Sequence, residues 1–90
     1  MTIPGTPREI ALQALLANSL VSIDLSVADA LRQGTIDVNL ADLGVDSLAR
    51  LELSIFLGER FEEEVAEPEV SDIQTFSALV NYISIRIGAE

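Results

Sequence analysis

The fold is organised around the stretch Leu43-Gly44-Val45-Asp46-Ser47-Leu48, which runs directly into a segment of mixed apolar and charged residues. Asp46 is a typical helix N-cap, because its carboxylate can accept a hydrogen bond from a first-turn amide. The pattern predicts a helix over Ser47 to Glu62, with Ser47 exposed in its first turn. Unpaired amides and the macrodipole make that helix end positive, so a phosphate ester on Ser47 would be stabilised there.

Two apolar stripes share the predicted helix and lie nearly opposite each other at 100° per residue. One stripe consists of Leu53, Leu57 and Phe61, and the other of Leu48, Leu51 and Ile55. One helix cannot bury both against a single core, so we interpret the first as core. We interpret the second as a partly exposed docking strip, interrupted by Glu52 and flanked by Glu59 and Glu62. The alternative is that both stripes are buried between neighbouring helices.

The composition predicts one small globular domain. Ninety residues hold one core but not two, so residues 1–90 are assigned to a single domain with residues 1–5 as a frayed start. Hydrophobic residues make up 49% of the chain, with one Tyr, three Phe and no Trp, so the core should be aliphatic. The sequence lacks Cys, which excludes disulfides and thiolate metal sites.

The charge points to basic partners. Fifteen acidic residues against five basic ones give a formal charge of −10, which repels nucleic acid and anionic membrane surfaces. The alternative is that the acidity only keeps a small apolar domain in solution. The N-terminus lacks a signal-peptide pattern and no stretch approaches membrane-spanning length, so we expect a cytoplasmic protein without membrane insertion. An apolar strip with an acidic border is compatible with a monomer that docks transiently.

The first helix is predicted to begin at Thr6-Pro7-Arg8-Glu9, a capping box with Pro at the first helical position. Apolar residues at intervals of three and four carry it to about Leu20 or Val21. The face expected to pack inward is Ile10, Ala11, Ala14, Leu15 and Leu16.

The connection over residues 22–46 is long enough to require structure of its own. A capping signal at Ser26 and a stop at Gly34 predict a short helix over Val27 to Gln33. Beyond it, apolar residues are interpreted as anchors that pin an extended path across the bundle. These anchors are Ile36, Val38, Leu40 and Leu43.

An acidic run with Pro68 inside it should end the central helix and form a solvated connection. Its acids are Glu62, Glu63, Glu64, Glu67 and Glu69. A turn of a short third helix is predicted at 71–73, and Thr75 should cap a last helix over Phe76 to Ile87, with Gly88 just past its end. The inward face of that helix is Phe76, Leu79, Val80, Ile83 and Ile87. The predicted fold class is therefore all-α: a small bundle of three main helices, a short third helix and an extra short helix in the first connection.

Catalysis finds no support in the sequence. The absence of His and Cys removes the usual general base, the thiol nucleophile and the common zinc ligands, so we expect neither an enzyme nor a metal site. Asp46 neighbours Ser47, but a carboxylate of ordinary pKa is a poor base for a hydroxyl. A calcium loop starting at Asp37 would need Gly at Asp42 and Glu at Leu48, so it fails twice.

The motif and its surroundings resemble the acyl carrier proteins, in which the Ser of an Asp-Ser-Leu motif carries a phosphopantetheine arm. The resemblance extends over nearly the whole chain, through Leu43-Gly44, Leu51-Glu52-Leu53, Phe61 and Val80-Asn81-Tyr82-Ile83. It implies that Ser47 accepts 4′-phosphopantetheine from coenzyme A through a phosphopantetheinyl transferase, with Asp46 and Leu48 as motif context. It also implies that acyl-loading and acyl-processing enzymes with basic surfaces bind the central helix. A third implication is that the bundle interior shelters the acyl chain; the alternative is a filled core.

Departures from the family pattern narrow the expected role. Leu43-Gly44-Val45 favours an acyl carrier over a peptidyl carrier, which more often shows paired glycines there. Ala49 and Gly58 stand where fatty-acid carriers usually have acids, and Arg50 and the long first connection add to the difference. A free-standing carrier for polyketide or other specialised acyl metabolism is therefore expected rather than one for fatty acid biosynthesis. The rival hypothesis is an acidic interaction module, in which Ser47 is only a helix-start residue.

Overall fold

The computed structural model describes residues 6–65 and 70–87. Its α-helices are α1 (Pro7–Leu16), α2 (Leu25–Gln33), α3 (Ser47–Phe61) and α5 (Phe76–Ile87), and a 3-10 helix, η1, spans Leu40–Leu43. Residues 70 and 71 are also helical, where the third short helix was expected. Within the described ranges the only β-type pairing is an isolated antiparallel bridge between Asn39 and Thr75. The all-α fold predicted from the sequence is thus confirmed.

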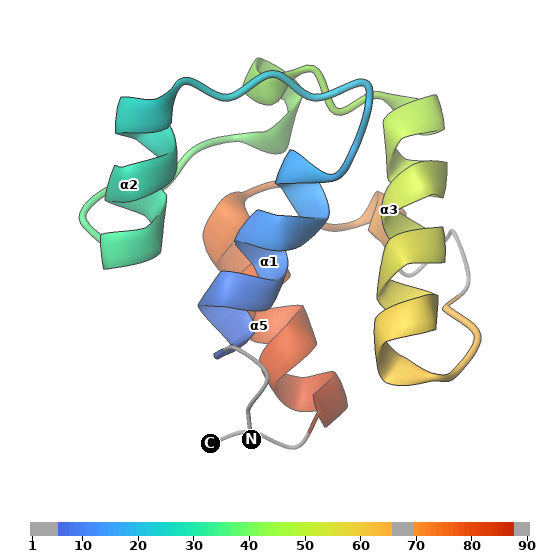
Figure 1. Ribbon diagram of the computed structural model, residues 1–90. Coiled ribbons are helices and arrows are strands. Elements are labelled where there is room, and N and C mark those ends of the chain that lie inside the picture. The colour runs from blue at the N-terminus through green and yellow to red at the C-terminus, as the bar shows by residue number, and fades with distance from the viewer. Residues whose placement is uncertain (1–5, 66–69, 88–90) are drawn as a thin grey trace.

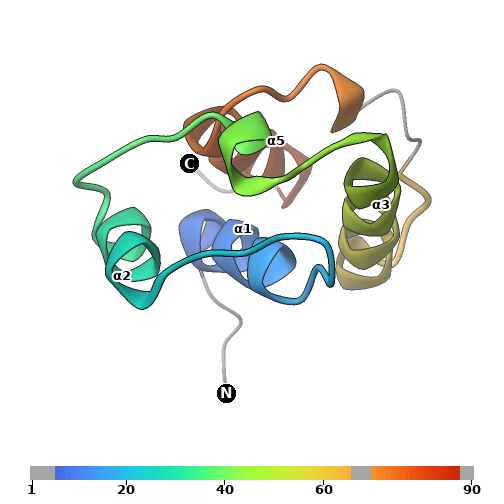
Figure 2. The same cartoon turned by 90° about the horizontal axis from the view of Figure 1, so that it is seen from above.

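Helix α1 is the centre of the bundle and contacts α2, α3 and α5. Seen from above, α2 and α3 flank α1 on opposite sides, and η1 crosses over the top of the bundle (Figure 2). In Figure 1 the chain leaves the top of α1 and reaches α3 only after the excursion through α2 and η1. This route delivers the start of α3 to the same end of the molecule as the end of α1.

The core is aliphatic, as the composition predicts. Side chains from every helix are completely buried, among them Leu12, Leu15, Leu31, Leu40, Leu53, Leu57, Phe76, Leu79 and Ile83. Burying a side chain of this size contributes about 1.5–3 kcal/mol relative to leaving it exposed. With no Cys in the sequence, this packing is the main source of stability.

Helix α1 begins as predicted but ends earlier. The Thr6 hydroxyl accepts a hydrogen bond from the Glu9 amide at 3.2 Å, which caps the helix. The predicted end at Leu20 or Val21 is wrong, because α1 stops at Leu16. The prediction that Leu16 packs inward is also wrong, since it is 51% exposed. The cause is Asn18, whose buried side chain bonds to the backbone of another helix and turns the chain away.

Helix α2 has nine residues, almost as many as the ten of α1, and begins at Leu25 rather than at Val27. Asp24, not Ser26, occupies its N-cap position. Its end is as predicted: Gly34 adopts φ 79°, a left-handed conformation that glycine accepts without steric cost. The expected extra short helix is therefore a full element of the bundle.

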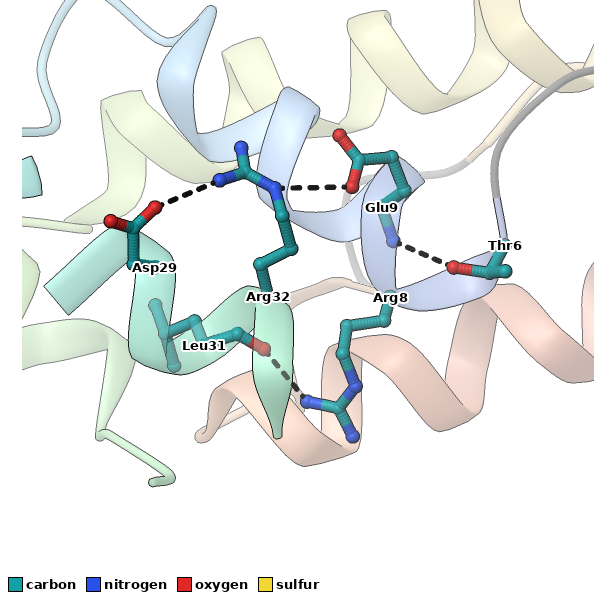
Figure 3. Close-up of polar contacts among 6 residues, drawn as sticks. All are labelled: Thr6, Arg8, Glu9, Asp29, Leu31 and Arg32. Atoms are coloured by element: carbon teal, nitrogen blue, oxygen red, sulfur yellow. Dashed lines mark hydrogen bonds and ion pairs between the residues drawn. The ribbon is translucent and has the colours of Figure 1, made fainter. Parts of the chain in front are cut away.

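Two arginines join α2 to α1 (Figure 3). Arg8 Nη1 donates to the Leu31 carbonyl oxygen at 3.1 Å, across the end of α2. Arg32 lies between Glu9 and Asp29, at 3.4 Å and 3.1 Å from their carboxylates. Such partly exposed ion pairs contribute little, about 0–1 kcal/mol, so the joint depends mainly on the buried Leu31.

The end of the first connection is pinned by backbone pairing. Leu40 N–H donates to the Gln74 carbonyl at 2.8 Å, and Phe76 N–H donates to the Val38 carbonyl at 3.0 Å. Leu40 is a buried anchor as predicted, and the core also contacts Val38 and Leu43. Two details were wrong: Ile36 is 41% exposed, and Leu40–Leu43 form η1 rather than an extended path.

The start of α5 is held by a side chain from far along the sequence. Asp37 accepts hydrogen bonds from the Ser77 amide at 2.8 Å and from the Ser77 hydroxyl at 2.7 Å. The Ser77 hydroxyl bond is the main reason that the pKa of the Asp37 carboxyl lies below its usual value. The predicted cap is confirmed, since the Thr75 hydroxyl accepts from the Ala78 amide at 3.1 Å.

Helix α3 ends at Phe61, one residue before the predicted end, and Glu62 follows with φ 57°. Gly58 permits the tight return of the chain, because a Cβ there would lie 3.0 Å from the Glu63 carbonyl oxygen. The acidic run was predicted to follow; its residues Glu67, Pro68 and Glu69, like Gly88, lie outside the described residues. At the end of α5, Ile87 is 42% exposed, so its predicted inward position is wrong.

Candidate functional site

The first turn of α3 is built by its own cap and by a glycine turn. Asp46 has extended backbone angles, and its carboxylate accepts a hydrogen bond from the Ala49 amide at 3.0 Å. Gly44 has φ 91°, and a Cβ there would lie 3.2 Å from the Leu20 carbonyl oxygen. Only glycine fits both constraints comfortably. These residues fix the point at which the helix begins.

Ser47 is the first residue of α3 and is exposed to solvent. Its hydroxyl makes no hydrogen bond to any part of the chain that the structure describes. The Asp46 carboxylate is engaged by the helix cap, so it acts as a structural acceptor. A hydroxyl at an exposed, positive helix end is accessible to a modifying enzyme and suited to an anionic ester.

The two stripes of α3 have the predicted environments. Leu53 and Leu57 are completely buried, whereas Leu48, Leu51 and Ile55 are 58%, 45% and 55% exposed. The alternative that both stripes are buried is therefore wrong. We call Leu48, Leu51 and Ile55 the exposed strip. It begins next to Ser47 and runs along α3.

Phe61, at the C-terminal end of the core stripe, packs differently from Leu53 and Leu57. Phe61 is only partly buried, and its ring lies 6.5 Å from that of Tyr82 on α5. The Arg86 guanidinium stacks over Phe61 at 5.3 Å and forms an ion pair with Glu63 at 2.7 Å. This cluster ties the end of α3 to α5 and leaves the start of α3 to be positioned by other contacts.

Glu52 is half-buried and is bonded to the end of α1 rather than presented freely. Its carboxylate accepts hydrogen bonds from the Ser19 amide at 3.2 Å and from the Ser19 hydroxyl at 3.1 Å. Next to it, Asn18 donates from Nδ2 to the Ala49 carbonyl at 2.8 Å and accepts from the Leu20 amide at 3.0 Å. We call Asn18 and Ser19 the α1–α3 clasp. It joins the end of α1 to the first two turns of α3.

Sequence reasoning did not find this clasp. An Asn followed by Ser after a helical pattern indicates a chain turn, which would have argued for an earlier end of α1. Their partners lie 31 and 33 residues away, and no local pattern identifies them.

Arg50 also faces the protein. Its Nη1 donates to the carbonyl oxygens of Val70 and Ile73, both at 2.6 Å. The first turn of α3 is thereby attached to the segment that leads into α5. Glu59, in contrast, is exposed and borders depressions on the surface of α3.

Among the described residues, no three His, Cys, Asp or Glu side chains are grouped so as to hold a metal ion. None of the described helices combines the length and apolarity needed to cross a membrane.

The fold and the site define a class of protein: a small helical bundle that presents a free hydroxyl at a helix start, beside an exposed apolar strip. The sequence profile of the phosphopantetheine attachment site family matches residues 23–83. The chain therefore belongs to this family, whose domain is the attachment site for covalent phosphopantetheine and carries groups rather than catalysing reactions.

One relative is an acyl carrier protein from Campylobacter fetus subsp. fetus (strain 82-40), which is 43% identical over 44 residues. The match covers 49% of this chain and 57% of that protein, so it spans only a little more than half of the relative's length. No solved structure matches the chain.

Proposed function

We propose that Ser47 carries 4′-phosphopantetheine and that the protein holds acyl groups as thioesters on this arm for delivery to partner enzymes. The observation that carries the proposal is the unengaged, exposed hydroxyl of Ser47 at the capped start of α3. When bound, the arm supplies a thiol, which the cysteine-free chain does not contain.

The residues around Ser47 fit a phosphodiester. The first-turn amides and the helix dipole favour the negative charge, and the Asp46 cap keeps the helix start in place. In the attachment step, the Ser47 oxygen forms a bond to the pantetheine phosphorus of coenzyme A. Adenosine 3′,5′-bisphosphate leaves, and the hydroxyl proton passes to the transferase.

The exposed strip supports a role in partner binding. Leu48, Leu51 and Ile55 lie on the same helix as Ser47, so a partner that docks on them is placed beside the arm. Glu59 adds an exposed acid, which favours partners with basic surfaces. Glu52 is proposed as a border of this surface through the clasp that holds it, not as a free docking charge.

A specialised acyl pathway, such as polyketide synthesis, is proposed over fatty acid synthesis. Ala49 is buried and Arg50 is bonded to backbone carbonyls, so the first turn of α3 presents fewer acids than a fatty-acid carrier would. Loading assays with malonyl, acetyl and aminoacyl donors test whether the protein is an acyl carrier or a peptidyl carrier. Preferential aminoacyl transfer would instead identify a peptidyl carrier.

The test of attachment is the intact mass of the purified protein before and after incubation with coenzyme A and a broad-specificity transferase. Wild type is expected to gain one phosphopantetheine, and Ser47→Ala to gain none. Ser77→Ala is the matched control, because Ser77 also lies in the first turn of a helix but its hydroxyl is bonded to Asp37. It should load as wild type does.

A folded wild-type protein that gains no mass would contradict the proposal. In that case the exposed strip of an acidic interaction module becomes the better explanation. Loading of Ser47→Ala would show that another hydroxyl carries the arm.

A further inference from the structure

The interior that could shelter an acyl chain is occupied by side chains. Leu53, Leu57 and Leu79 are completely buried and belong to one packed cluster. Leu53 and Leu57 face this interior, yet neither borders the depressions at α3 that are described below. An acyl chain therefore needs either a rearranged core or a place on the surface.

A surface depression of about 220 Å³ lies between α1 and α3. Ala14 and Ala17 form its α1 side, and their small side chains leave the space open. Ile55 and Phe56 form its α3 side. A cavity of roughly 150 Å³ lined by apolar side chains is large enough to bind benzene, so this volume can accept a short hydrocarbon chain.

Two of the three polar groups at the rim are bonded within the protein. Asn18 is bonded at both ends of its amide, and Glu52 is bonded to Ser19. Because these groups already have protein partners, an apolar ligand beside them removes fewer hydrogen bonds to water than it would beside unbonded side chains. Glu59 stands at the end farther from Ser47 and limits the length of apolar chain that fits.

The depression lies within reach of Ser47. Ile55 is eight residues further along α3, which is about 12 Å along the helix axis at 1.5 Å per residue. Extended phosphopantetheine is longer than this. Ile55 also belongs to the exposed strip, so an apolar surface from Leu48 to Ile55 leads from the attachment point to the depression.

A second depression, of about 560 Å³, lies on the other side of Ile55. Its wall includes the glutamates Glu59, Glu62, Glu63 and Glu64. A wall of carboxylates disfavours hydrocarbon, because the charged groups would lose hydration against it. The smaller depression is therefore the better apolar site.

We propose that the depression between α1 and α3 binds the acyl chain of the loaded protein and favours short chains over long ones. This inference rests on the proposed function, since it requires the arm on Ser47. It assigns chain-length selection to the depression lined by Ala17, Ile55, Phe56 and the buried Ala14, rather than to the interior at Leu53, Leu57 and Leu79.

The test is amide chemical-shift mapping of ¹⁵N-labelled protein loaded with acetyl-, hexanoyl- or dodecanoyl-phosphopantetheine from the matching coenzyme A thioesters. Relative to the acetyl form, hexanoyl should shift the amides of Ala17, Asn18 and Phe56. Dodecanoyl should add little at these positions, because the excess chain extends past Glu59. Hydroxylamine should cleave the hexanoyl thioester severalfold more slowly than the acetyl thioester.

The matched variants are Ala17→Leu and Ala78→Leu. Ala17 and Ala78 are both exposed, so both variants should fold, but only the first fills the depression. Ala17→Leu should abolish the hexanoyl-specific shifts and the difference in cleavage rate, while Ala78→Leu keeps both.

Hexanoyl-specific shifts centred on Leu53, Leu57 and Leu79 would overturn the proposal, because they would place the chain in the core. Identical spectra for the acetyl and hexanoyl forms would overturn it as well. The wild-type series decides between these outcomes even if Ala17→Leu does not fold. Failure of loading itself is read separately from the intact mass, and it would remove the proposed function along with this inference.

Discussion

The starts of α3 and α5 are alike in sequence and opposite in use. Each helix has a capping side chain, Asp46 or Thr75, and each has a serine in its first turn. The hydroxyl of Ser77 is bonded to Asp37, whereas that of Ser47 is left free. A serine at a helix start is thus ordinary structure when its hydroxyl is bonded, and a candidate attachment point when other groups hold the helix.

The helix start at Ser47 is held by groups that do not use its hydroxyl. Asn18 and Arg50 attach the first turns of α3 to α1 and to the segment before α5. Substitutions of Asn18, Arg50 and Asp46 test how these groups hold the start of α3, and substitution of Asp37 tests the start of α5.

The largest effect is expected for Asn18→Ala. Asn18 is only 5% exposed, and the variant leaves the Ala49 carbonyl and the Leu20 amide without their partner. The free energy of unfolding should fall by about 2 to 3 kcal/mol, measured by urea denaturation. Asn81→Ala, at an exposed position of α5, is the control and should change little. An equal effect of both variants would refute the importance of the clasp.

Next is Arg50→Gln, which removes a charged donor from two backbone carbonyls. We expect a loss of about 1.5 kcal/mol in the free energy of unfolding. Arg32→Gln is the comparison, because its exposed ion pairs should contribute only a few tenths of a kcal/mol. If Arg50→Gln is as stable as wild type, the link between the two helix starts is not energetically significant.

Two substitutions of Asp46 separate its role as a helix cap from a role in recognition by the transferase. Asp46→Ala removes the cap and should lower the free energy of unfolding by about 1 kcal/mol, whereas Asp46→Asn should keep nearly all of it. Both variants are then assayed for phosphopantetheine loading. Slow loading of the stable Asp46→Asn protein would show that the transferase reads the charge, while normal loading would leave Asp46 as a cap alone.

The smallest effect is expected for Asp37→Asn and depends on pH. Because the folded-state pKa of Asp37 lies below its usual value of 3.8, the carboxylate stabilises the fold above that pH. The stabilisation is lost as the pH falls through the lowered pKa. Since Asp37 is exposed, Asp37→Asn should cost less than about 1 kcal/mol at pH 7, and the difference from wild type should vanish as the pH falls through the lowered pKa of Asp37. The free energies of unfolding of both proteins are measured by chemical denaturation from pH 7 to pH 2. A difference between them that stays constant over this range would contradict this account.

The starts of α1, α3 and α5 were predictable from the sequence because their signals are local, whereas α2 begins two residues before the predicted Val27. Thr6, Asp46 and Thr75 each cap the helix that their position indicates, through bonds to amides three residues ahead. The end of α1 was not predictable, because it is set by Asn18 and a carbonyl 31 residues away. Leu16 continues the apolar period of α1 but emerges into solvent for the same reason.

In the candidate site, too, some features were predictable from the sequence and others were not. Helical periodicity predicted the buried Leu53 and Leu57 and the exposed strip opposite them. The orientation of Glu52 toward Ser19 was not readable, since an acid beside an apolar strip has the same pattern whether it is free or bonded. The depression at Ala17 could not be predicted from the sequence either, because it depends on where α1 ends.

The excursion between α1 and α3 closes on itself. The carbonyl of Leu20 lies against Gly44, and the Ser22 amide donates to the Leu43 carbonyl at 3.4 Å, so the two ends of the connection meet. The entropy of closing such a loop rises by only about 0.6 kcal/mol for each doubling of its length. Residues can therefore be inserted into the exposed parts of this excursion at little thermodynamic cost while Ser47 stays in place, whereas removal of α2 would take the buried Leu31 out of the core.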